Sequence, residues 1–332
     1  MVGVGPIGVA CALAVAVDRS LELVGMVDLD PAKVGRTLGE LSGGNGAKKS
    51  GPVVVDDLEK ALHGGADVAV VTTSSKFDKV APTLQRLISE SVAVVSSCEQ
   101  MVWPWYRHRE LADVIDAAAR RTGCAVLGTG VNPGFVMDSL AVTIASVLHR
   151  VTSVRCVRRV DAGLRRSPLQ AKIGATLSQR QFRELAGQGG IGHRGLAESV
   201  VMLAAGLGEC VEPGAVCESL EPCLADRAMQ SALGLISPGE VCGIHNVAHW
   251  RSGELIIELD LTMAVGLADP KDIVHLDGPV NLSVTIPGSV PGDSATVAVL
   301  INHIPIVCNA QSGIRTMLDL PVAGCRGRDG RG

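Results

Sequence analysis

A carboxylate stands where a buried strand is expected to end, in the stretch SSCEQMVWPW at residues 96–105. Residues 92–95 are Val-Ala-Val-Val, a run that indicates a strand buried on both faces, and Glu99 follows it closely. Apolar side chains come next, at Met101, Trp103 and Trp105. A carboxylate beside apolar walls stabilises positive charge, so this pattern favours a substrate that becomes cationic during the reaction. The alternative for Glu99 is a helix cap or a surface acid.

The stretch GVGPIG at residues 3–8 matches the G-x-G-x-x-G pattern of dinucleotide-binding loops. Its glycines, Gly3, Gly5 and Gly8, let the backbone approach a pyrophosphate, and the apolar residues 9–17 predict the helix whose N-terminus supplies amide donors. Asp28 comes twenty residues after Gly8, at the end of a predicted strand, where a carboxylate holds ribose hydroxyls. The combination predicts a nicotinamide dinucleotide site, against the alternative of an ordinary glycine turn.

Asp28 also bears on which nicotinamide cofactor binds. Its negative charge repels the 2′-phosphate of NADP, which favours NAD. Lys33 and Arg36 are close enough in sequence to reach such a phosphate if Asp28 turned aside, although a solvated helix face is the plainer interpretation. We therefore expect NAD(P)H as the cofactor, with NAD favoured and NADP left open.

Two more loops are expected beside this site, because ligands of open parallel sheets bind at the carboxyl ends of the strands. TTSSK at residues 72–76 follows a predicted strand at 67–72, and GTGVNPGF at residues 128–135 follows one at 125–127. For the hydroxyls of the first loop, simple turn chemistry is an equal alternative. The predicted cofactor-binding residues are Gly3, Gly5, Pro6, Ile7, Gly8, Asp28, Lys33, Thr72, Thr73, Ser74, Cys98 and Asn132.

The elements that must position these residues alternate along the first half of the chain. Strands are expected at residues 21–27, 53–55, 67–72, 92–97 and 125–127, with helices at 77–88 and 110–121. This rhythm predicts an α/β domain with a Rossmann-type, doubly wound parallel sheet over residues 1–135. Only Met1 and Val2 precede the glycine loop, so we expect a stunted first strand.

The second half of the chain changes character. Residues 257–263 alternate apolar and polar side chains, which is typical of a half-buried antiparallel strand. Residues 151–160 and 280–286 are also strand-like, and 179–186 and 195–207 are helical in pattern. We predict a second, α+β domain over residues 136–322, built on an open, mainly antiparallel sheet. The helical pattern beginning at Asp293 is expected to pack back onto the first domain, and residues 323–332 to form a flexible tail.

The composition limits the classes of function. Charged residues make up 19% of the 332, the formal net charge is -4 and no basic block stands out, which argues against a nucleic-acid partner. Apolar runs are too short to span a membrane, and no signal peptide is evident. The ten cysteines show neither C-x-x-C pairs nor zinc spacing, so we expect core thiols, no metal and a cytoplasmic location.

These stretches resemble the family of 2,4-diaminopentanoate dehydrogenases and native amine dehydrogenases, whose cofactor domain is related to that of dihydrodipicolinate reductases. The similar stretches run through nearly the whole chain: SSCEQ, GTGVNPGFVMD, RRSPLQAKIGA, GHRGLAESVVMLAAGLG, ADPKDIVHLDGP and INHIPIVCNAQSGIRTMLDLP. The resemblance implies NAD(P)H-dependent reductive amination of a small ketone or aldehyde by ammonia to a primary amine, and the reverse oxidative deamination. It also implies a homodimer formed through the open sheet.

The resemblance further implies roles for single residues. The family's acidic residue falls on Glu99, which would anchor ammonia, assist proton transfer and stabilise an iminium. The chain departs from the family at Gln100 and Met101, where relatives often carry a second acid and a smaller residue. For His245 a structural role is the plainer interpretation. The expected substrate-pocket residues are Met101, Trp103, Phe135, Met137 and His245.

Three other functions stay open at this point. A dehydrogenase of 2,4-diaminopentanoate itself would need a cation for the substrate carboxylate, and Arg165 and Arg166 are candidates, although solvated arginines are the plainer interpretation. A dihydrodipicolinate reductase-like carbonyl or imine reductase would lack its His-His pair here, and a sugar-oxidising relative would lack the lysine after Glu99. A cofactor-binding sensor would leave Glu99 idle.

Overall fold

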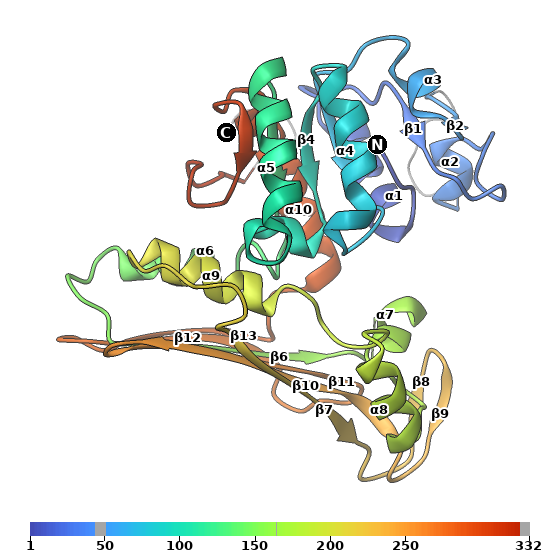
Figure 1. The fold of residues 1–332 in the computed structure, drawn as a ribbon. Helices are drawn as coiled ribbons and strands as arrows, with labels where there is room; N and C mark the ends of the chain where they lie inside the picture. Colours follow the sequence, from blue (N-terminus) through green and yellow to red (C-terminus); the bar gives the residue numbers. More distant parts are fainter. Residues whose placement is uncertain (44–50, 164, 326–332) are drawn as a thin grey trace. The chain divides into compact units, whose positions relative to one another are not determined.

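The computed structural model describes residues 1–43, 51–163 and 165–325, and the chain divides into two compact units (Figure 1). The first unit holds Met1–Gly134 and the chain from Pro291 onward, and the second holds Phe135–Val290. The prediction counted residues 291–322 in the second domain but expected their helix to pack back onto the first, and the structure groups this segment with the first unit. Of the predicted flexible tail, residues 326–332 lie outside the described part.

Helix α10 (Gly292–Cys308) explains this grouping. Its buried side chains Leu300, Ile304 and Val307 belong to the same apolar core as the strands of the first unit. The helix packs against α1 (Pro6–Val17) and lies over the strands of the parallel sheet. The chain therefore leaves the first unit after Gly134 and returns to it for its last described elements.

The first unit is built on parallel strands. Their bounds are β1 (Met26–Val27), β2 (Val54–Val55), β3 (Val68–Val71), β4 (Ala93–Ser96), β5 (Ala125–Gly128) and β14 (Gly313–Arg315). The order is β14-β5-β4-β3 in one group, and β1 pairs with β2 in the other. Val2 forms isolated parallel bridges to Val27 and Val71 and so joins the two groups, which confirms the expected stunted first strand. The strand predicted at 21–27 is reduced to β1, because Met1 and Val2 offer partners only beside its end.

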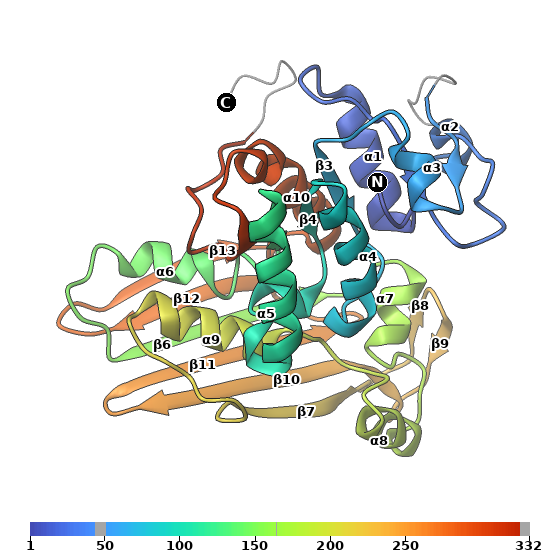
Figure 2. The same ribbon diagram turned by 45° about the horizontal axis from the view of Figure 1, so that its top comes forward.

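Helices pack over this sheet (Figure 2). Short helices α2 (Leu38–Leu41) and α3 (Leu58–Leu62) follow β1 and β2. Helix α4 (Phe77–Ser89) buries Phe77, Val80 and Leu84 at helical spacing, and it packs against α5 (Trp105–Thr122). The helix predicted at 110–121 thus begins earlier, and it bends at His108, whose backbone is non-helical.

The second unit is a six-stranded sheet with helices on one face. The strand order is β13 (Leu282–Pro287), β12 (Lys271–Asp277), β6 (Ser153–Asp161), β11 (Leu255–Ala264), β10 (Val241–Ser252) and β7 (Cys217–Leu224). Only the β6–β11 pair is parallel, so the sheet is mainly antiparallel, as predicted. Helix α9 (Leu196–Gly206) packs on β7, β10 and β11, and α6 (Ser139–Ala145) packs on α9 and β12. Smaller elements are α7 (Ser167–Lys172), α8 (Gln179–Gly187) and the β8–β9 hairpin (Met229–Ser231, Gly234–Ile236).

The alternation predicted at residues 257–263 decides which face of this sheet is covered. Ile257, Leu259 and Leu261 are fully buried beneath the helices, whereas Glu258 and Asp260 are partly exposed on the other face. A strand with one apolar and one polar face belongs to a sheet covered on one side. The second face of the sheet is therefore uncovered within this unit.

Candidate active site

The glycine loop turns tightly into helix α1. Gly3 has a φ of +86°, a conformation that favours glycine, and the hydroxyl of Thr72 donates a hydrogen bond of 2.8 Å to its carbonyl oxygen. Gly5 is the N-cap of α1, and Pro6 and Ile7 open its first turn. No side chain caps this helix in the part of the chain that the structure describes. Its first amides and its positive dipole end are thus available to a phosphate.

Substitutions at Gly8 and Gly5 separate the fold of this loop from the space that it leaves for a ligand. A methyl group at Gly8 would lie 1.9 Å from the carbonyl oxygen of Gly3, whereas one at Gly5 would meet no protein atom within 4 Å. We expect Gly8→Ala to lower both the melting temperature and NADH affinity, the latter by about tenfold or more, because the loop must open. Gly5→Ala is expected to keep the melting temperature and lose affinity, because its methyl group would take up space that the predicted pyrophosphate needs.

Calorimetric melting and a fluorescence titration with NADH measure both quantities. The Gly5→Ala variant is the matched control for the fold, since it adds the same methyl group without a clash. Unchanged affinity in Gly5→Ala would mean that the dinucleotide does not pass over this loop.

Asp28 follows β1 and lies beside the glycine loop. Its carboxylate accepts hydrogen bonds from the amides of Val4 (2.8 Å) and Asp30 (3.0 Å) and from Nζ of Lys33 (3.1 Å). Partial burial alone would raise the pKa of Asp28, but the two amide hydrogen bonds and the Lys33 ammonium outweigh it and hold that pKa below its usual value. Asp28 is therefore a fixed negative charge at the place where the sequence predicted a ribose-binding carboxylate.

The loop after β3 is tied to the loop after β4. The hydroxyl of Ser96 donates to the carbonyl of Val71 (3.0 Å) and accepts from the amide of Cys98 (3.1 Å). The amide of Gln100 donates to the carbonyl of Ser75 (3.3 Å). Thr72, Thr73 and Ser74, which were predicted to line the cofactor site, thus stand next to the turn that contains Glu99.

Glu99 opens a 3-10 turn, η1 (Glu99–Val102), and is partly buried. The side chain of Gln100 holds this turn in place. Its Oε1 accepts a hydrogen bond from the amide of Phe77 (2.9 Å) and lies 3.3 Å from Nε2 of His108. On the other side the turn packs against the end of β5, where a methyl group at Gly128 would lie 2.3 Å from Cβ of Met101. The backbone that carries Glu99 is therefore held from two neighbouring elements.

The third predicted loop follows β5. The amide of Thr129 donates to the carbonyl of Ser96 (2.9 Å), which places this loop beside the β4 loop. Asn132 precedes a cis peptide bond to Pro133 and is partly buried. Gly134 has a φ of +122°, and a methyl group there would lie 2.5 Å from the amide nitrogen of Gly130, so the turn requires glycine. The structure thus brings all three predicted loops and the glycine loop to one edge of the parallel sheet.

The predicted substrate-pocket residues are not gathered in one unit. Met101 is 1% exposed and belongs to the apolar core of the first unit, while Trp103 is partly exposed with its ring 6.3 Å from that of Trp105. Phe135 and Met137 belong to the second unit, and Met137 is fully buried. A common pocket for these side chains stays a prediction.

His245 lies on the uncovered face of the second-unit sheet. Its neighbours along β10, Ile244 and Asn246, are buried on the helix-covered face. Nε2 of His245 lies 2.9 Å from Oδ1 of Asp260 on β11. The contact with Asp260 agrees with the structural role that was the plainer interpretation of His245. A role of His245 in the substrate pocket stays a prediction.

Sequence reasoning missed Ser96 and the side chain of Gln100 as residues that hold the site together. The available signal was the position of each: Ser96 is the last residue of β4, and Gln100 directly follows the candidate acid. A polar side chain at the carboxyl end of a buried strand needs a hydrogen-bond partner, and the neighbouring loop supplies one. Their partners are 25 and 23 residues away, which the sequence alone does not reveal.

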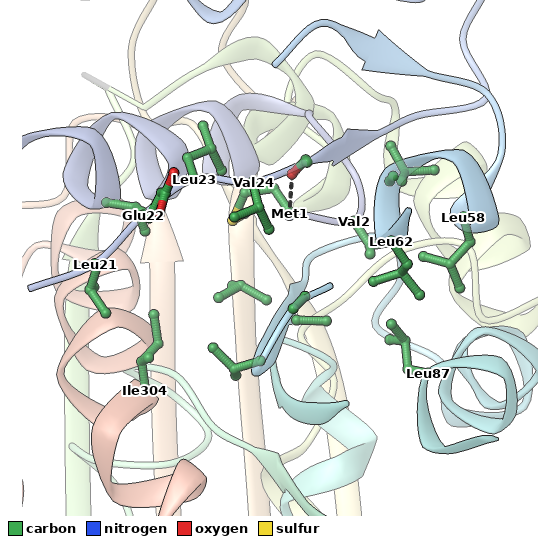
Figure 3. Close-up of a pocket in the computed structure, with 18 residues that line it drawn as sticks. Met1, Val2, Leu21, Glu22, Leu23, Val24, Leu58, Leu62, Leu87 and Ile304 are labelled. Carbon is green, nitrogen blue, oxygen red and sulfur yellow. Dashed lines mark hydrogen bonds between the residues drawn. The ribbon is translucent and has the colours of Figure 1, made fainter. Parts of the chain in front are cut away.

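An apolar pocket in the first unit lies away from this edge (Figure 3). The lining comes from the segment before β1, from α3, and from β3 with the residue two positions before it. These residues are Leu21, Leu23, Val24, Leu58, Leu62, Ala66, Val68, Ala69 and Val70. The amino group of Met1, beside this pocket, donates to the carbonyl of Gly25 at 2.8 Å. Because the pocket is at the amino ends of the strands, it is separate from the candidate active site.

Two features of the described residues bear on other classes of function. No group of three or more His, Cys, Asp or Glu side chains among them is arranged to hold a metal ion. None of the described helices has the length and apolar character needed to cross a membrane.

Comparisons with known proteins agree with this architecture. A sequence model of the 2,4-diaminopentanoate dehydrogenase C-terminal domain matches residues 135–331. The 2,4-diaminopentanoate dehydrogenase of Acetoanaerobium sticklandii is 29% identical over 333 residues, which cover 97% of this chain and 92% of that protein. An amine dehydrogenase of Streptomyces virginiae is 28% identical over 165 residues, or 48% of this chain and 44% of that protein. The solved structure of an amine dehydrogenase from Mycobacterium smegmatis matches with a TM-score of 0.87 and 26% identity, covering 99% of this chain and 97% of that one.

Proposed function

The chain belongs to the 2,4-diaminopentanoate dehydrogenase family, and from this premise we propose that it is an NAD(P)-dependent amine dehydrogenase that also aminates carbonyl compounds. In one direction the substrates are a primary amine and water. In the other they are ammonia and a small ketone or aldehyde. The activity towards amines follows from the relatives, which are amine and 2,4-diaminopentanoate dehydrogenases, and the reductive direction is our extension of it.

The position of Glu99 is the observation that supports this reaction. Ammonia adds to the carbonyl group, and loss of water with uptake of one proton gives an iminium, which carries a positive charge that the carbonyl compound lacks. A partly buried carboxylate at the edge of the sheet lowers the energy of this cation and accepts or returns protons as nitrogen adds. The hydrogen bond between Gln100 and the amide of Phe77 fixes the backbone next to Glu99. The carboxylate therefore needs little reorganisation when the positive charge of the iminium develops.

The first unit fits a nicotinamide dinucleotide. The pyrophosphate would lie over Gly3, Gly5 and Gly8 at the N-terminus of α1, and Asp28 would hold the ribose hydroxyls. When bound, the cofactor supplies or accepts the hydride at the carbon that bears nitrogen. The remaining residues proposed to line it are Pro6, Ile7, Lys33, Thr72, Thr73, Ser74, Cys98 and Asn132.

Ammonium dependence tests the proposed reaction. We expect oxidation of NADH or NADPH, followed by its absorbance, when a small ketone and ammonium are both present, because the hydride acceptor is the iminium. Omission of ammonium is the control and should abolish the reaction. Equal rates without ammonium would instead identify a carbonyl reductase, and nucleotide binding without any turnover would identify a sensor.

A dehydrogenase of 2,4-diaminopentanoate itself is the second candidate, because the Acetoanaerobium sticklandii relative, of which 92% is covered, is a 2,4-diaminopentanoate dehydrogenase. This substrate carries a carboxylate, for which Arg165 or Arg166 would supply a bidentate partner. Comparing the deamination rates of 2,4-diaminopentanoate and of an amine without a carboxylate distinguishes the two candidates.

A homodimer through the uncovered face of the second-unit sheet is part of the proposal. Partly exposed apolar residues on this face, among them Val157, Ile256 and Ile273, alternate with charged residues such as Arg155, whose guanidinium pairs with Glu258 at 2.9 Å. A mixed apolar and charged sheet face is well suited to a symmetric partner. Five of the ten cysteines are buried, as expected of core thiols, whereas Cys210, Cys217, Cys308 and Cys325 are exposed. A cytoplasmic location stays part of the proposal on the cysteine spacing of the sequence.

A further inference from the structure

The ion pair between Lys33 and Asp28 joins two residues of the proposed cofactor site whose charges are opposite. Nζ of Lys33 lies 3.1 Å from Oδ2 of Asp28 and 3.5 Å from Oδ2 of Asp30. The side chains of Lys33 and Asp28 are 27% and 14% exposed, so the pair is partly shielded from water. A shielded pair is weakened less by solvent and salt than an ordinary surface pair.

This pair changes what Asp28 does to a nucleotide. A lone carboxylate at the adenosine ribose rejects a 2′-phosphate because two negative charges would meet. Here, an ammonium is in contact with the same carboxylate oxygen that accepts the amide of Val4. Any ligand group that approaches Asp28 therefore also comes within reach of a positive charge, which attracts a phosphate and offsets the repulsion.

Arg36, the other cation of this segment, is engaged elsewhere. Its Nη2 donates to the carbonyl oxygen of Glu40 at 2.7 Å, within the segment that forms α2. Lys33 is held between two carboxylates, so it keeps one partner if it leaves the other. Of the two cations that sequence reasoning proposed for a phosphate, the structure singles out Lys33.

We propose that Lys33 is the residue that sets the nucleotide preference, by countering Asp28 so that the chain binds both NAD and NADP. The inference rests on the proposed function, because it requires a dinucleotide on the glycine loop. Asp28 holds the ribose hydroxyls of NAD, and Lys33 binds the 2′-phosphate of NADP. Without Lys33 the site is that of a strictly NAD-dependent enzyme.

Binding measurements on the full chain test this without turnover. Dissociation constants for NADH and NADPH are measured by fluorescence titration in the wild type, in Lys33→Met and in Arg36→Met. We expect Lys33→Met to weaken NADPH binding at least about tenfold more than NADH binding, because only NADPH presents a phosphate to the ammonium. Arg36→Met is the matched control, since it removes a nearby cation that faces Glu40, and it should change neither constant by more than about threefold.

The outcomes separate the two proposals. Wild-type protein that binds neither nucleotide refutes the proposed function. Wild-type protein that binds NADH but not NADPH overturns the inference alone, as does an equal loss of both nucleotides in Lys33→Met or a loss of NADPH only in Arg36→Met. Melting temperatures of the variants show whether a loss of affinity comes from a folding defect. Titration with ADP-ribose and with its 2′-phosphate shows whether the change in affinity depends on the 2′-phosphate.

Discussion

Replacing Glu99 with glutamine is expected to lower the rate of reductive amination by about a hundredfold or more, while NADH affinity changes by less than about threefold. Glutamine keeps the size and most hydrogen bonds of glutamate but carries no negative charge and takes up no proton. The iminium then forms without its counter-charge, and the proton that moves as nitrogen adds has no acceptor on this turn. The glycine loop and Asp28 are untouched, so nucleotide binding should persist.

Saturating rates of NADH oxidation with ketone and ammonium measure this effect, together with the fluorescence titration of NADH. Glu110→Gln is the matched control, because it makes the same chemical change on an exposed residue of α5 in the same unit. A Glu99→Gln variant that retains turnover within about threefold of wild type would assign the proton transfer and the charge to another residue.

Much of the parallel sheet is predictable from the sequence, because its strands bury both faces and are short runs of Val and Ala. The run predicted at residues 92–97 is β4, and the helix predicted at 77–88 is α4 to within one residue. The failure at residues 21–27 has a physical cause, since a strand exists only where a neighbour can accept its hydrogen bonds. The packing of α10 on the first unit was expected from the sequence, although residues 291–322 were counted in the second domain because they follow it along the chain.

The sequence predicts which loops form the candidate site but not the side-chain hydrogen bonds that hold those loops in place. Parallel strands align their carboxyl ends, so the loops after β3, β4 and β5 could be brought together by topology alone. The hydrogen bond from the amide of Phe77 to Gln100 could not, because it depends on where the side chains point after folding. Lys33 lies only five residues from Asp28, yet whether it faces that carboxylate or solvent is decided by the turn between them.

A buried ion pair secures the end of the second unit. Nη1 of Arg158 on β6 lies 2.7 Å from both carboxylate oxygens of Asp272 on β12, and the two residues are 2% and 1% exposed. Asp272 also accepts from the hydroxyl of Ser289 (3.1 Å) and the amide of Val290 (2.7 Å), and Arg158 donates to the carbonyl of Val290 (2.8 Å). The pair therefore holds the last residues of the unit, just before the chain enters α10.

Asp272→Asn should lower the free energy of unfolding by about 3–5 kcal/mol, because it leaves a buried guanidinium without its counter-charge. Burial lowers the pKa of Arg158, and the negative charge of Asp272 opposes that shift. The variant therefore removes the charge that stabilises the buried guanidinium cation. Glu254→Gln is the control, since its partner Arg150 and Glu254 itself are more than half exposed and such a pair is worth about 1 kcal/mol or less. Urea unfolding followed by circular dichroism measures both variants.

The double variant Arg158→Met with Asp272→Leu is expected to recover most of the loss, because no buried charge then remains. Two results would contradict this role of the pair: an Asp272→Asn variant that unfolds like wild type, or a double variant as unstable as the single one. In either case other contacts hold Ser289 and Val290 against the strands.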